Sequence, residues 1–230
     1  MNVLIIGGST DIGINLASYL TKLNYNVIVT YNNNIINDTN IKSIKCDVTN
    51  EQEIEKVINY VINSYGKIDI LINMAAISID GEYGLLSKKD FMNVLEVNLV
   101  GTFLTSKIYS KYINDGMIIN VSSTDGIDTC SRYSMFYSAS KAGIINLTKS
   151  MSLGINNKVL CIAPNWIDSK TTRSMNQEYL NSELKRINQS RLIKIDEFCD
   201  GIYKIINSDN NTGTIFRMDI RDDKLWIEKV

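Results

Sequence analysis

The sequence contains no histidine, and this absence excludes several classes of catalytic and metal site. Ser-His-Asp and Cys-His catalysis both need an imidazole base, and many zinc sites need an imidazole ligand. Any proton transfer in this protein must therefore use tyrosine, lysine, aspartate, glutamate, cysteine or water.

Cysteine and proline are scarce. The 4 cysteines, Cys46, Cys130, Cys161 and Cys199, lie far apart and form no Cys-x-x-Cys pair. This spacing is typical of free thiols in a reducing compartment, so we expect a cytoplasmic protein. Pro164 is the only proline, and no Pro-, Gly- or Ser-rich linker interrupts the chain, which favours one domain over residues 1–230.

The sequence also lacks a surplus of charge and a long apolar run. The formal net charge is -1, so no basic footprint for a nucleic acid is expected. No apolar segment approaches the length of a membrane span, and residues 1–6 are better explained as a first strand than as a signal peptide. The 44% hydrophobic content is sufficient for a buried core.

Short β-branched runs alternate with amphipathic helical segments along the chain. The expected strands cover residues 3–6, 27–29, 41–46, 68–72, 117–121 and 159–162. The family resemblance given below implies one more, near Met218. Helical periodicity follows most of these strands, including long stretches over 88–111 and 133–153. The alternation predicts an α/β fold: a three-layer, doubly wound, Rossmann-like parallel sheet of about seven strands. The pattern is weakest over residues 170–211.

A glycine-rich turn joins the first strand to the first helix. Its residues are Gly7, Gly8, Ser9, Thr10, Asp11, Ile12 and Gly13. Free backbone N–H groups and the helix dipole at such a turn attract a phosphate, so the turn is a candidate dinucleotide site. The competing interpretation is a glycine-rich turn that only begins a helix.

Tyr137 and Lys141 form the most informative pair. At a spacing of i and i+4 they share one helix face. A nearby ammonium and a nicotinamide cation would favour the phenolate, and lowering the tyrosine pKa by ~2–3 corresponds to roughly 3–4 kcal/mol. Ser122 and Ser123 end a strand at the carboxyl edge of the sheet, where ligands bind in this class of fold. The alternative for the Tyr-Lys pair alone is an ordinary surface pair.

Together these features resemble the short-chain dehydrogenase/reductase family, whose turn reads Thr-Gly-x-x-x-Gly-x-Gly. Gly7 and Gly13 match that turn, Ile6 replaces the threonine, and Asp11 replaces the middle glycine. A carboxylate there would repel a pyrophosphate unless its side chain turns away. Because aspartate is a good N-cap, we interpret Asp11 as a helix cap.

The resemblance implies the catalytic roles. Ser123 would hydrogen-bond the substrate oxygen and Tyr137 would act as the acid–base. Lys141 would bind the nicotinamide ribose and lower the Tyr137 pKa. Asn98 would hold a proton-relay water.

The resemblance also implies cofactor contacts along the chain. Asp47 and Val48 follow the third strand, at the adenine. Asn73 and Ala75 match the family's Asn-Asn-Ala-Gly strand end, with Met74 and Ala76 as departures. The family's Pro-Gly-x-x-x-Thr segment corresponds here to Pro164, Asn165, Trp166, Ile167, Asp168 and Ser169.

The end of the second strand bears on the choice of cofactor. Tyr31 and Asn32 provide neither the acidic group that binds a ribose hydroxyl nor the basic group that binds a 2′-phosphate. The Thr30-Tyr31 ending is more similar to the NADP branch of the family, so we expect NADP in preference to NAD.

The favoured function is therefore a carbonyl reductase or alcohol dehydrogenase with a small-molecule substrate, and a 3-oxoacyl group on acyl carrier protein is one candidate. The substrate walls are expected within 125–135 and 170–187. A second interpretation is a catalytically inactive dinucleotide-binding regulator or scaffold, which is favoured by the departures from the family motifs at Asp11, Met74 and Asn165. A third, a nucleotide-sugar epimerase, is less favoured because such enzymes carry a larger C-terminal substrate domain than these 230 residues can hold. The family resemblance also implies a homodimer or homotetramer, packed through residues 91–112 and 136–153.

Overall fold

Eight strands form a single sheet in the computed structural model, which describes residues 1–230. The spatial order is β3-β2-β1-β4-β5-β6-β7-β8. The strands are β1 (Asn2–Ile6), β2 (Asn26–Tyr31), β3 (Lys42–Lys45), β4 (Ile70–Asn73), β5 (Met117–Val121), β6 (Lys158–Pro164), β7 (Ile215–Arg221) and β8 (Lys224–Lys229). Strands β1 to β7 are parallel. The chain changes direction across the sheet between β1 and β4, which opens a crevice at their carboxyl ends.

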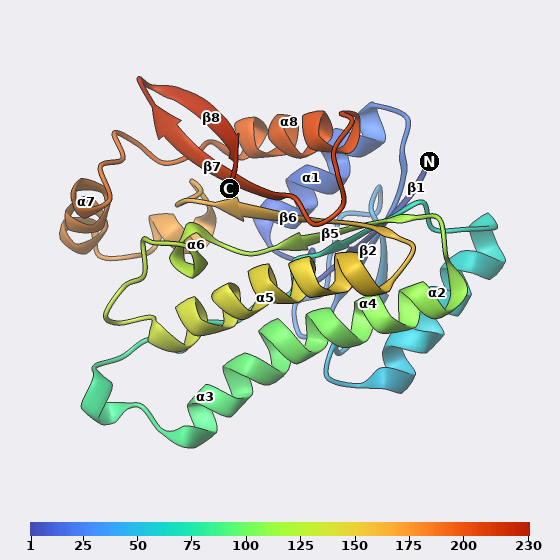
Figure 1. The fold of residues 1–230 in the computed structure, drawn as a ribbon, viewed down its shortest axis with the longest axis horizontal. Coiled ribbons are helices and arrows are strands. Elements are labelled where there is room, and N and C mark those ends of the chain that lie inside the picture. The colour runs from blue at the N-terminus through green and yellow to red at the C-terminus, as the bar shows by residue number, and fades with distance from the viewer.

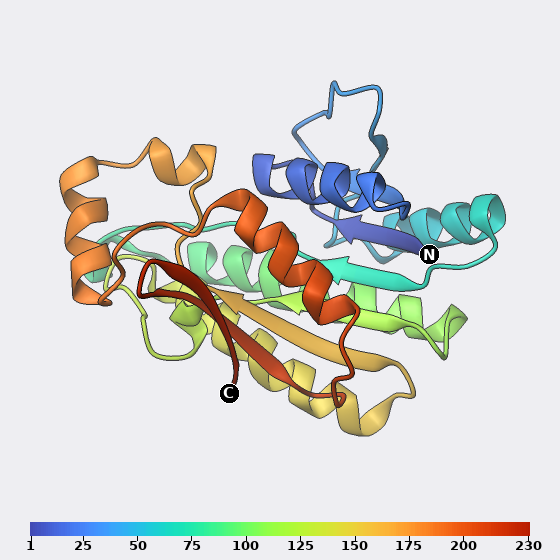
Figure 2. The same ribbon diagram turned by 90° about the horizontal axis from the view of Figure 1, so that it is seen from above.

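Helices cover both faces of the sheet, giving three layers (Figures 1 and 2). Helices α1 (Asp11–Lys22) and α8 (Ile195–Ile206) pack side by side on one face. Helices α2 (Glu51–Tyr65), α4 (Gly101–Tyr112) and α5 (Met135–Gly154) cover the other face. The short helices α6 (Lys170–Arg173) and α7 (Gln177–Arg186) lie beyond the carboxyl ends of β5 and β6 (Figure 1). No helix is both long and apolar enough to cross a lipid bilayer.

Local sequence signals explain where the first helices begin. The side chain of Asn50 caps α2, accepting hydrogen bonds from the amides of Gln52 at 3.0 Å and Glu53 at 3.3 Å. Thr10 caps α1, and its hydroxyl accepts a hydrogen bond from the Gly13 amide at 3.4 Å. The prediction that Asp11 is the cap is therefore wrong, because Asp11 is already the first residue of the helix.

The long helical stretch predicted over 88–111 is interrupted by a change of helix type. Helix α3 (Lys88–Leu95) continues into the π-helical segment η2 (Glu96–Val100) and then into α4. A π-helical turn displaces the residues that follow it and is frequent at functional sites. Asn98, one of the predicted catalytic residues, lies within this segment and is completely buried.

The eighth strand is a correction to the predicted sheet of about seven strands. β8 pairs with β7 in antiparallel fashion, and the turn between them places Asp222 and Asp223 at φ values of 49° and 58°. Positive φ at both positions is the geometry of a tight hairpin turn whose twist matches the strands. Leu225 and Ile227 pack against the core under α8, so the alternating tail covers the edge of β7.

Candidate active site

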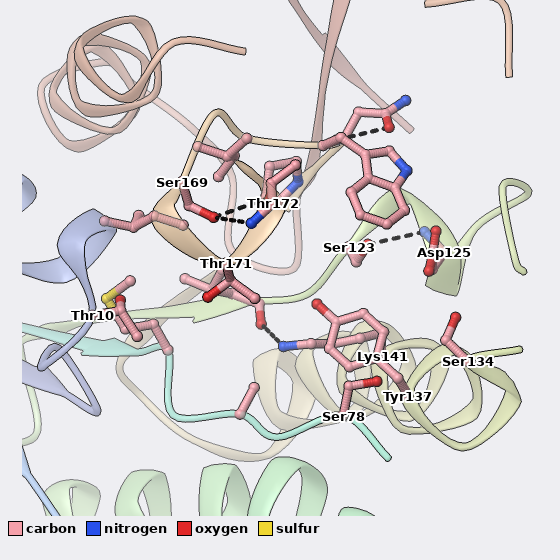
Figure 3. A pocket seen from close by; sticks show the side chains of 18 of the residues that line it. Thr10, Ser78, Ser123, Asp125, Ser134, Tyr137, Lys141, Ser169, Thr171 and Thr172 are labelled. Atoms are coloured by element: carbon pink, nitrogen blue, oxygen red, sulfur yellow. Dashed lines mark hydrogen bonds between the residues drawn. The ribbon is translucent and has the colours of Figure 1, made fainter. Parts of the chain in front are cut away.

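A cavity of about 320 Å³ lies at the carboxyl edge of the sheet, where β4, β5 and β6 end (Figure 3). Its walls come from the turn before α1, from the segments that follow these strands, and from α5. The predicted site residues that line it are Thr10, Ile12, Ser123, Tyr137, Lys141, Pro164, Ile167 and Ser169. The topology therefore brings these predicted site residues together, although the first and the last of them, Thr10 and Ser169, are 159 positions apart in the chain.

Tyr137 and Lys141 project from the same face of α5 into the cavity (Figure 3). Lys141 is 2% exposed, and its Nζ lies 5.2 Å from the centre of the Tyr137 ring. The same Nζ donates a hydrogen bond to the Val121 carbonyl at 2.8 Å, and Ser122 Oγ donates to the Lys141 carbonyl at 2.7 Å. The end of β5 and the first turns of α5 are thus joined by two hydrogen bonds under the cavity.

Burial controls the ionisation of this pair. It lowers the pKa of Lys141 to about 8, because the charged ammonium loses its contact with water. It also raises the pKa of Tyr137 above its ordinary value; the Asp125 carboxylate adds to the rise and the Ser123 hydroxyl opposes it. Lys141 is not among the groups that shift this pKa in the structure, so its predicted lowering of the Tyr137 pKa beside a bound cofactor stays a prediction. The ammonium lies over the ring and donates to a carbonyl, while the phenol group is desolvated.

Ser123 lies just after β5 and caps the short helix η3 (Thr124–Gly126). Its Oγ accepts a hydrogen bond from the Asp125 amide at 3.1 Å, which fixes the hydroxyl at the edge of the cavity beside Tyr137 (Figure 3). Hydroxyl and phenol groups thus converge on one side of the cavity, as a substrate carbonyl oxygen requires.

Asn98 lies behind the cavity and connects two of its walls. Its Oδ1 accepts a hydrogen bond from the Ile77 amide at 2.8 Å. Its Nδ2 donates to the Ile77 carbonyl at 2.9 Å and to Ser140 Oγ at 3.0 Å. Ser140 Oγ in turn donates to the Tyr137 carbonyl at 2.7 Å. The side chain of Asn98 therefore joins the loop after β4 to the turn of α5 that carries Tyr137.

The predicted phosphate turn has the shape and the free donors that a pyrophosphate needs. Gly7 has a φ of +76°, and a Cβ there would lie 2.3 Å from the Ala75 Cα. A Cβ at Gly13 would lie 2.4 Å from the Gly8 Cα, so neither position accepts a side chain. The amides of residues 9–12 have no acceptor within the protein. This turn fits a dinucleotide phosphate.

The carboxylate of Asp11 turns from this set of amides toward the segment after β6. Its Oδ2 accepts a hydrogen bond from the backbone amide of Lys170 at 2.6 Å. Ser169, immediately before, caps α6 by accepting from the Thr172 amide at 3.2 Å (Figure 3). Asp11 therefore connects the phosphate turn to the outer wall of the cavity.

The residues predicted for the adenosine end lie apart from the cavity, at the carboxyl ends of β2 and β3. Thr49 donates to Asp47 Oδ1 from its amide at 2.9 Å and from its hydroxyl at 2.8 Å. These donors, with a smaller contribution from Asn32, hold the pKa of Asp47 below its ordinary value. Val48 is buried against Gly101, and Tyr31 ends β2.

Asn73 and Ala75 lie at the end of β4 and just beyond it. The amide group of Asn73 is fully used inside the protein: it donates to Ser106 and Asn120, each at 2.9 Å, and accepts from Thr105 at 2.8 Å. The side chain of Asn73 therefore faces the core. Ala75 lies against Gly7, so the end of β4 supports the phosphate turn.

The structure adds residues to the cavity that sequence motifs did not single out. They are Asp80 and Ser78 from the loop after β4, Asp125 and Ser134 after β5, and Thr171, Thr172 and Met175 around α6. Asp125, Ser134 and the α6 residues fall within the predicted wall segments, and Trp166, from the segment matched to the family's Pro-Gly-x-x-x-Thr, also lines the cavity. Asp80 was missed; its position in the loop that follows a central strand was the available signal.

Comparison with known proteins assigns the family. Residues 1–180 match the family model of the short chain dehydrogenases. This chain belongs to that family. It is an oxidoreductase that depends on a nicotinamide dinucleotide, and the sheet order and the phosphate turn described above fit this cofactor.

Relatives of known name support this assignment. The chain is 30% identical over 227 residues to carbonyl reductase family member 4 of Xenopus laevis, covering 94% of each chain. It is 31% identical over 181 residues to the 3-oxoacyl-[acyl-carrier-protein] reductase FabG of Thermotoga maritima, covering 75% of this chain and 73% of the relative. The solved structure of ElxO with NADP bound superposes with a TM-score of 0.77 at 27% identity, covering 94% of this chain and 96% of that one.

Proposed function

We propose that this short-chain dehydrogenase/reductase interconverts a small carbonyl compound and its alcohol, with Tyr137 as the acid–base. The observation that carries the proposal is the convergence of Ser123, Tyr137 and Lys141 on one cavity beside the phosphate turn. A protein that holds substrate and cofactor side by side in a fixed orientation makes hydride transfer faster than a chance encounter in solution does.

Each side chain has a defined task in the proposed reaction. The bound cofactor supplies or accepts the hydride. In the direction of reduction, Tyr137 Oη donates a proton to the carbonyl oxygen, which Ser123 Oγ orients by a hydrogen bond. Lys141, with a pKa of about 8, is mostly an ammonium at neutral pH and stabilises the phenolate left on Tyr137. Asn98 holds the loop and helix that frame the route by which a proton returns through water.

In this proposal the cofactor contacts of the family are carried over to the matching residues of this chain. Gly7, Ser9, Thr10, Ile12 and Gly13 would hold the pyrophosphate. Asp47 and Val48 would border the adenine, and Tyr31 and Asn32 the adenosine ribose. At the nicotinamide end the contacts would come from Ala75, Pro164, Ile167 and Ser169 and from the backbone of Asn73, since the Asn73 side chain faces the core.

The preferred cofactor in this proposal is NADP. No acidic side chain ends β2, so nothing there repels a 2′-phosphate. The similar structure of ElxO contains NADP. Titration with NADPH and with NADH, followed by nicotinamide fluorescence, tests the preference; tighter binding of NADH would contradict it.

A 3-oxoacyl thioester is a second candidate substrate, favoured by the FabG relative. An acidic carrier protein would require a free basic surface beside the cavity. Lys111 is instead paired with Glu55 at 2.8 Å, and Lys107 lies 3.9 Å from Glu51. Reduction of a 3-oxobutanoyl thioester at a rate well below that of simple ketones would exclude this candidate.

Replacing Tyr137 tests the proposed reaction. Tyr137→Phe removes the proton donor and keeps the ring, so kcat should fall about 10²–10⁴-fold while the cofactor Kd stays nearly constant. Tyr133→Phe is the matched control, because Tyr133 does not line the cavity and stacks edge-on against Tyr179. A wild-type protein that binds cofactor but turns over no carbonyl compound would favour the inactive regulator or scaffold instead.

The proposed assembly is a homodimer or homotetramer packed through α4 and α5. Both helices carry exposed apolar side chains, with Phe103 43% and Leu153 90% exposed. Burying such side chains against a second copy favours association. Light scattering that gives the mass of a single chain would overturn this part of the proposal.

A further inference from the structure

The cavity has an unbalanced set of charges. Three carboxylates line it, from Asp11, Asp80 and Asp125, and Lys141 is the one basic side chain among its lining residues. Lys141 cannot neutralise all three, since its Nζ is committed to the Val121 carbonyl at the floor of the cavity. A cavity with this excess attracts positive charge and repels anions.

Asp125 is the carboxylate closest to the reaction. It follows Ser123 by two residues and faces Tyr137, whose pKa it raises (Figure 3). Thr129 donates one hydrogen bond to its Oδ1 at 3.0 Å. The Asp125 carboxylate is partly buried, and no lysine or arginine forms an ion pair with it.

The nearest arginine is engaged elsewhere. Arg186 pairs with Glu183 at 2.7 Å and donates to the Thr129 carbonyl at 2.8 Å. Burial raises the pKa of Asp125; the Thr129 hydroxyl and the positive charge of Arg186 oppose the rise, and the negative charges of Glu183 and Asp80 add to it. A carboxylate in this condition is stabilised when a cation from outside takes up its free oxygen.

The other two carboxylates differ in how free they are to bind a cation. Asp11 is held by the Lys170 amide. Asp80 is exposed at the cavity entrance, accepts a hydrogen bond from Ser78, and like Asp125 has no basic partner. Trp166 adds an aromatic wall to the same cavity, and an indole face attracts a cation more strongly than the ring of tyrosine or phenylalanine does.

On the basis of the proposed reaction, we infer that the substrate is a ketone or alcohol carrying a cationic amine. The amine would bind Asp125, with Asp80 at the entrance, while the oxygen to be reduced lies between Ser123 and Tyr137. Asp125 is thus assigned as a specificity-determining residue. An anionic substrate would meet the same carboxylates as a repulsive barrier.

Three ketones of matched size test the inference. They are acetonyltrimethylammonium, its uncharged isostere 4,4-dimethylpentan-2-one, and the anion 4-oxopentanoate. Wild-type kcat/KM, measured with NADPH and with NADH, should favour the ammonium ketone over the isostere by about 10-fold or more, with the anion the poorest. Calorimetric Kd values for the same compounds on the cofactor complex should follow the same order without requiring turnover.

Two variants locate the effect. Asp125→Asn keeps the shape and removes the charge, so the preference for the ammonium ketone should shrink to about 2–3-fold, while the cofactor Kd is unchanged. Glu178→Gln is the control, since it removes one exposed carboxylate of α7 that does not line the cavity. It should leave the preference intact. Asp80→Asn, at an exposed position, provides a second test if Asp125→Asn is unstable.

The outcomes separate this inference from the proposed function. Equal kcat/KM and Kd values for the three ketones, a preference for the anion, or an unaltered preference in Asp125→Asn would each overturn the charge assignment and leave the reductase standing. Failure to bind either cofactor, or failure of Tyr137→Phe to lower turnover, would instead count against the proposed function.

Discussion

The carboxylate of Asp11 accepts a hydrogen bond from the backbone amide of Lys170, 159 residues further along the chain, at 2.6 Å. One end of this contact is the first residue of α1, beside the free amides of the phosphate turn. The other end is the first residue of α6, at the outer wall of the cavity. The hydrogen bond explains how a carboxylate is accommodated at a turn suited to a pyrophosphate.

Removing the charge of Asp11 should strengthen cofactor binding. Asp11→Asn retains an oxygen that can accept from the Lys170 amide but no longer repels the pyrophosphate. We expect the NADPH Kd to fall about 3–10-fold at low salt, with a smaller change at high salt because ions screen the repulsion. Fluorescence titration at two ionic strengths measures this. Weaker binding by Asp11→Asn at both would show that the carboxylate contributes to the site.

Lys141→Met should abolish turnover and raise the free energy of unfolding, and the gain in stability should depend on pH. The folded-state pKa of Lys141, about 8, lies below the ordinary lysine value of 10.5. The unfolded chain therefore holds more protons between these two values, so the stability contributed by this group rises as the pH increases through that window. At neutral pH the buried ammonium is a cost, and Lys141→Met should be more stable than wild type by about 1–3 kcal/mol.

Urea unfolding of wild type and Lys141→Met at about pH 7 and about pH 10 tests this expectation. The advantage of the variant should shrink at the higher pH, while its turnover is lost at both. Lys149→Met, which replaces an exposed lysine on the same helix, is the control. A variant that is less stable than wild type at pH 7 would mean that the hydrogen bond to Val121 outweighs the cost of burial.

Asn98→Ala should break the connection between the loop after β4 and the turn of α5 that carries Tyr137. The substitution leaves the Ile77 amide and carbonyl without their partner, and an unsatisfied buried group costs about 1–3 kcal/mol. We expect lower stability, a lower kcat and a nearly unchanged cofactor Kd, because the phosphate turn is remote from this contact. Asn93→Ala, on the exposed side of α3, should change none of these. Loss of stability with an unaltered kcat would limit Asn98 to a structural role.

Asn165 anchors the segment that follows β6. Its Nδ2 donates to the buried Asp219 carboxylate at 2.9 Å, and its Oδ1 accepts from the Trp166 amide at 2.8 Å. Asn165→Gly removes both hydrogen bonds, so stability should fall by about 1–3 kcal/mol. KM for the carbonyl substrate should rise because Trp166 is no longer fixed in the cavity wall. Denaturant unfolding and steady-state kinetics measure the two effects, and an unchanged KM would show that Asn165 acts on folding alone.

The local patterns predicted most of the fold. The β-branched runs and the amphipathic stretches are local patterns, and six of the seven parallel strands and the main helices followed from them; the seventh followed from the family resemblance near Met218. The π-helical segment at Asn98 was not predicted, because its side-chain pattern is that of an ordinary helix. Residues 224–228 alternate as a strand does, but the hairpin that joins them to β7 was not predicted, because its turn is Asp222-Asp223, without the usual glycine.

The site was predictable where its residues form short motifs. Tyr137 and Lys141 share one helix face, and the spacing alone shows it. The contact of Asp11 with Lys170 and the position of Asp80 near Asp125 depend on how separate loops meet in space, which no local pattern contains. The rise in the Tyr137 pKa on burial could not be predicted for a related reason: desolvation depends on everything packed around the phenol group.

The buried side-chain amides of Asn73 and Asn120 form a hydrogen-bond network beneath the cavity. Asn73 donates to Asn120, and Asn120 Nδ2 donates to Thr148 on α5, each at 2.9 Å. These directional contacts keep β4, β5 and α5 in register whatever residues follow the strands. Asp80 and Asp125 take no part in this network, so substitutions at these two positions leave it intact, and new substrate preferences could be engineered or could evolve there.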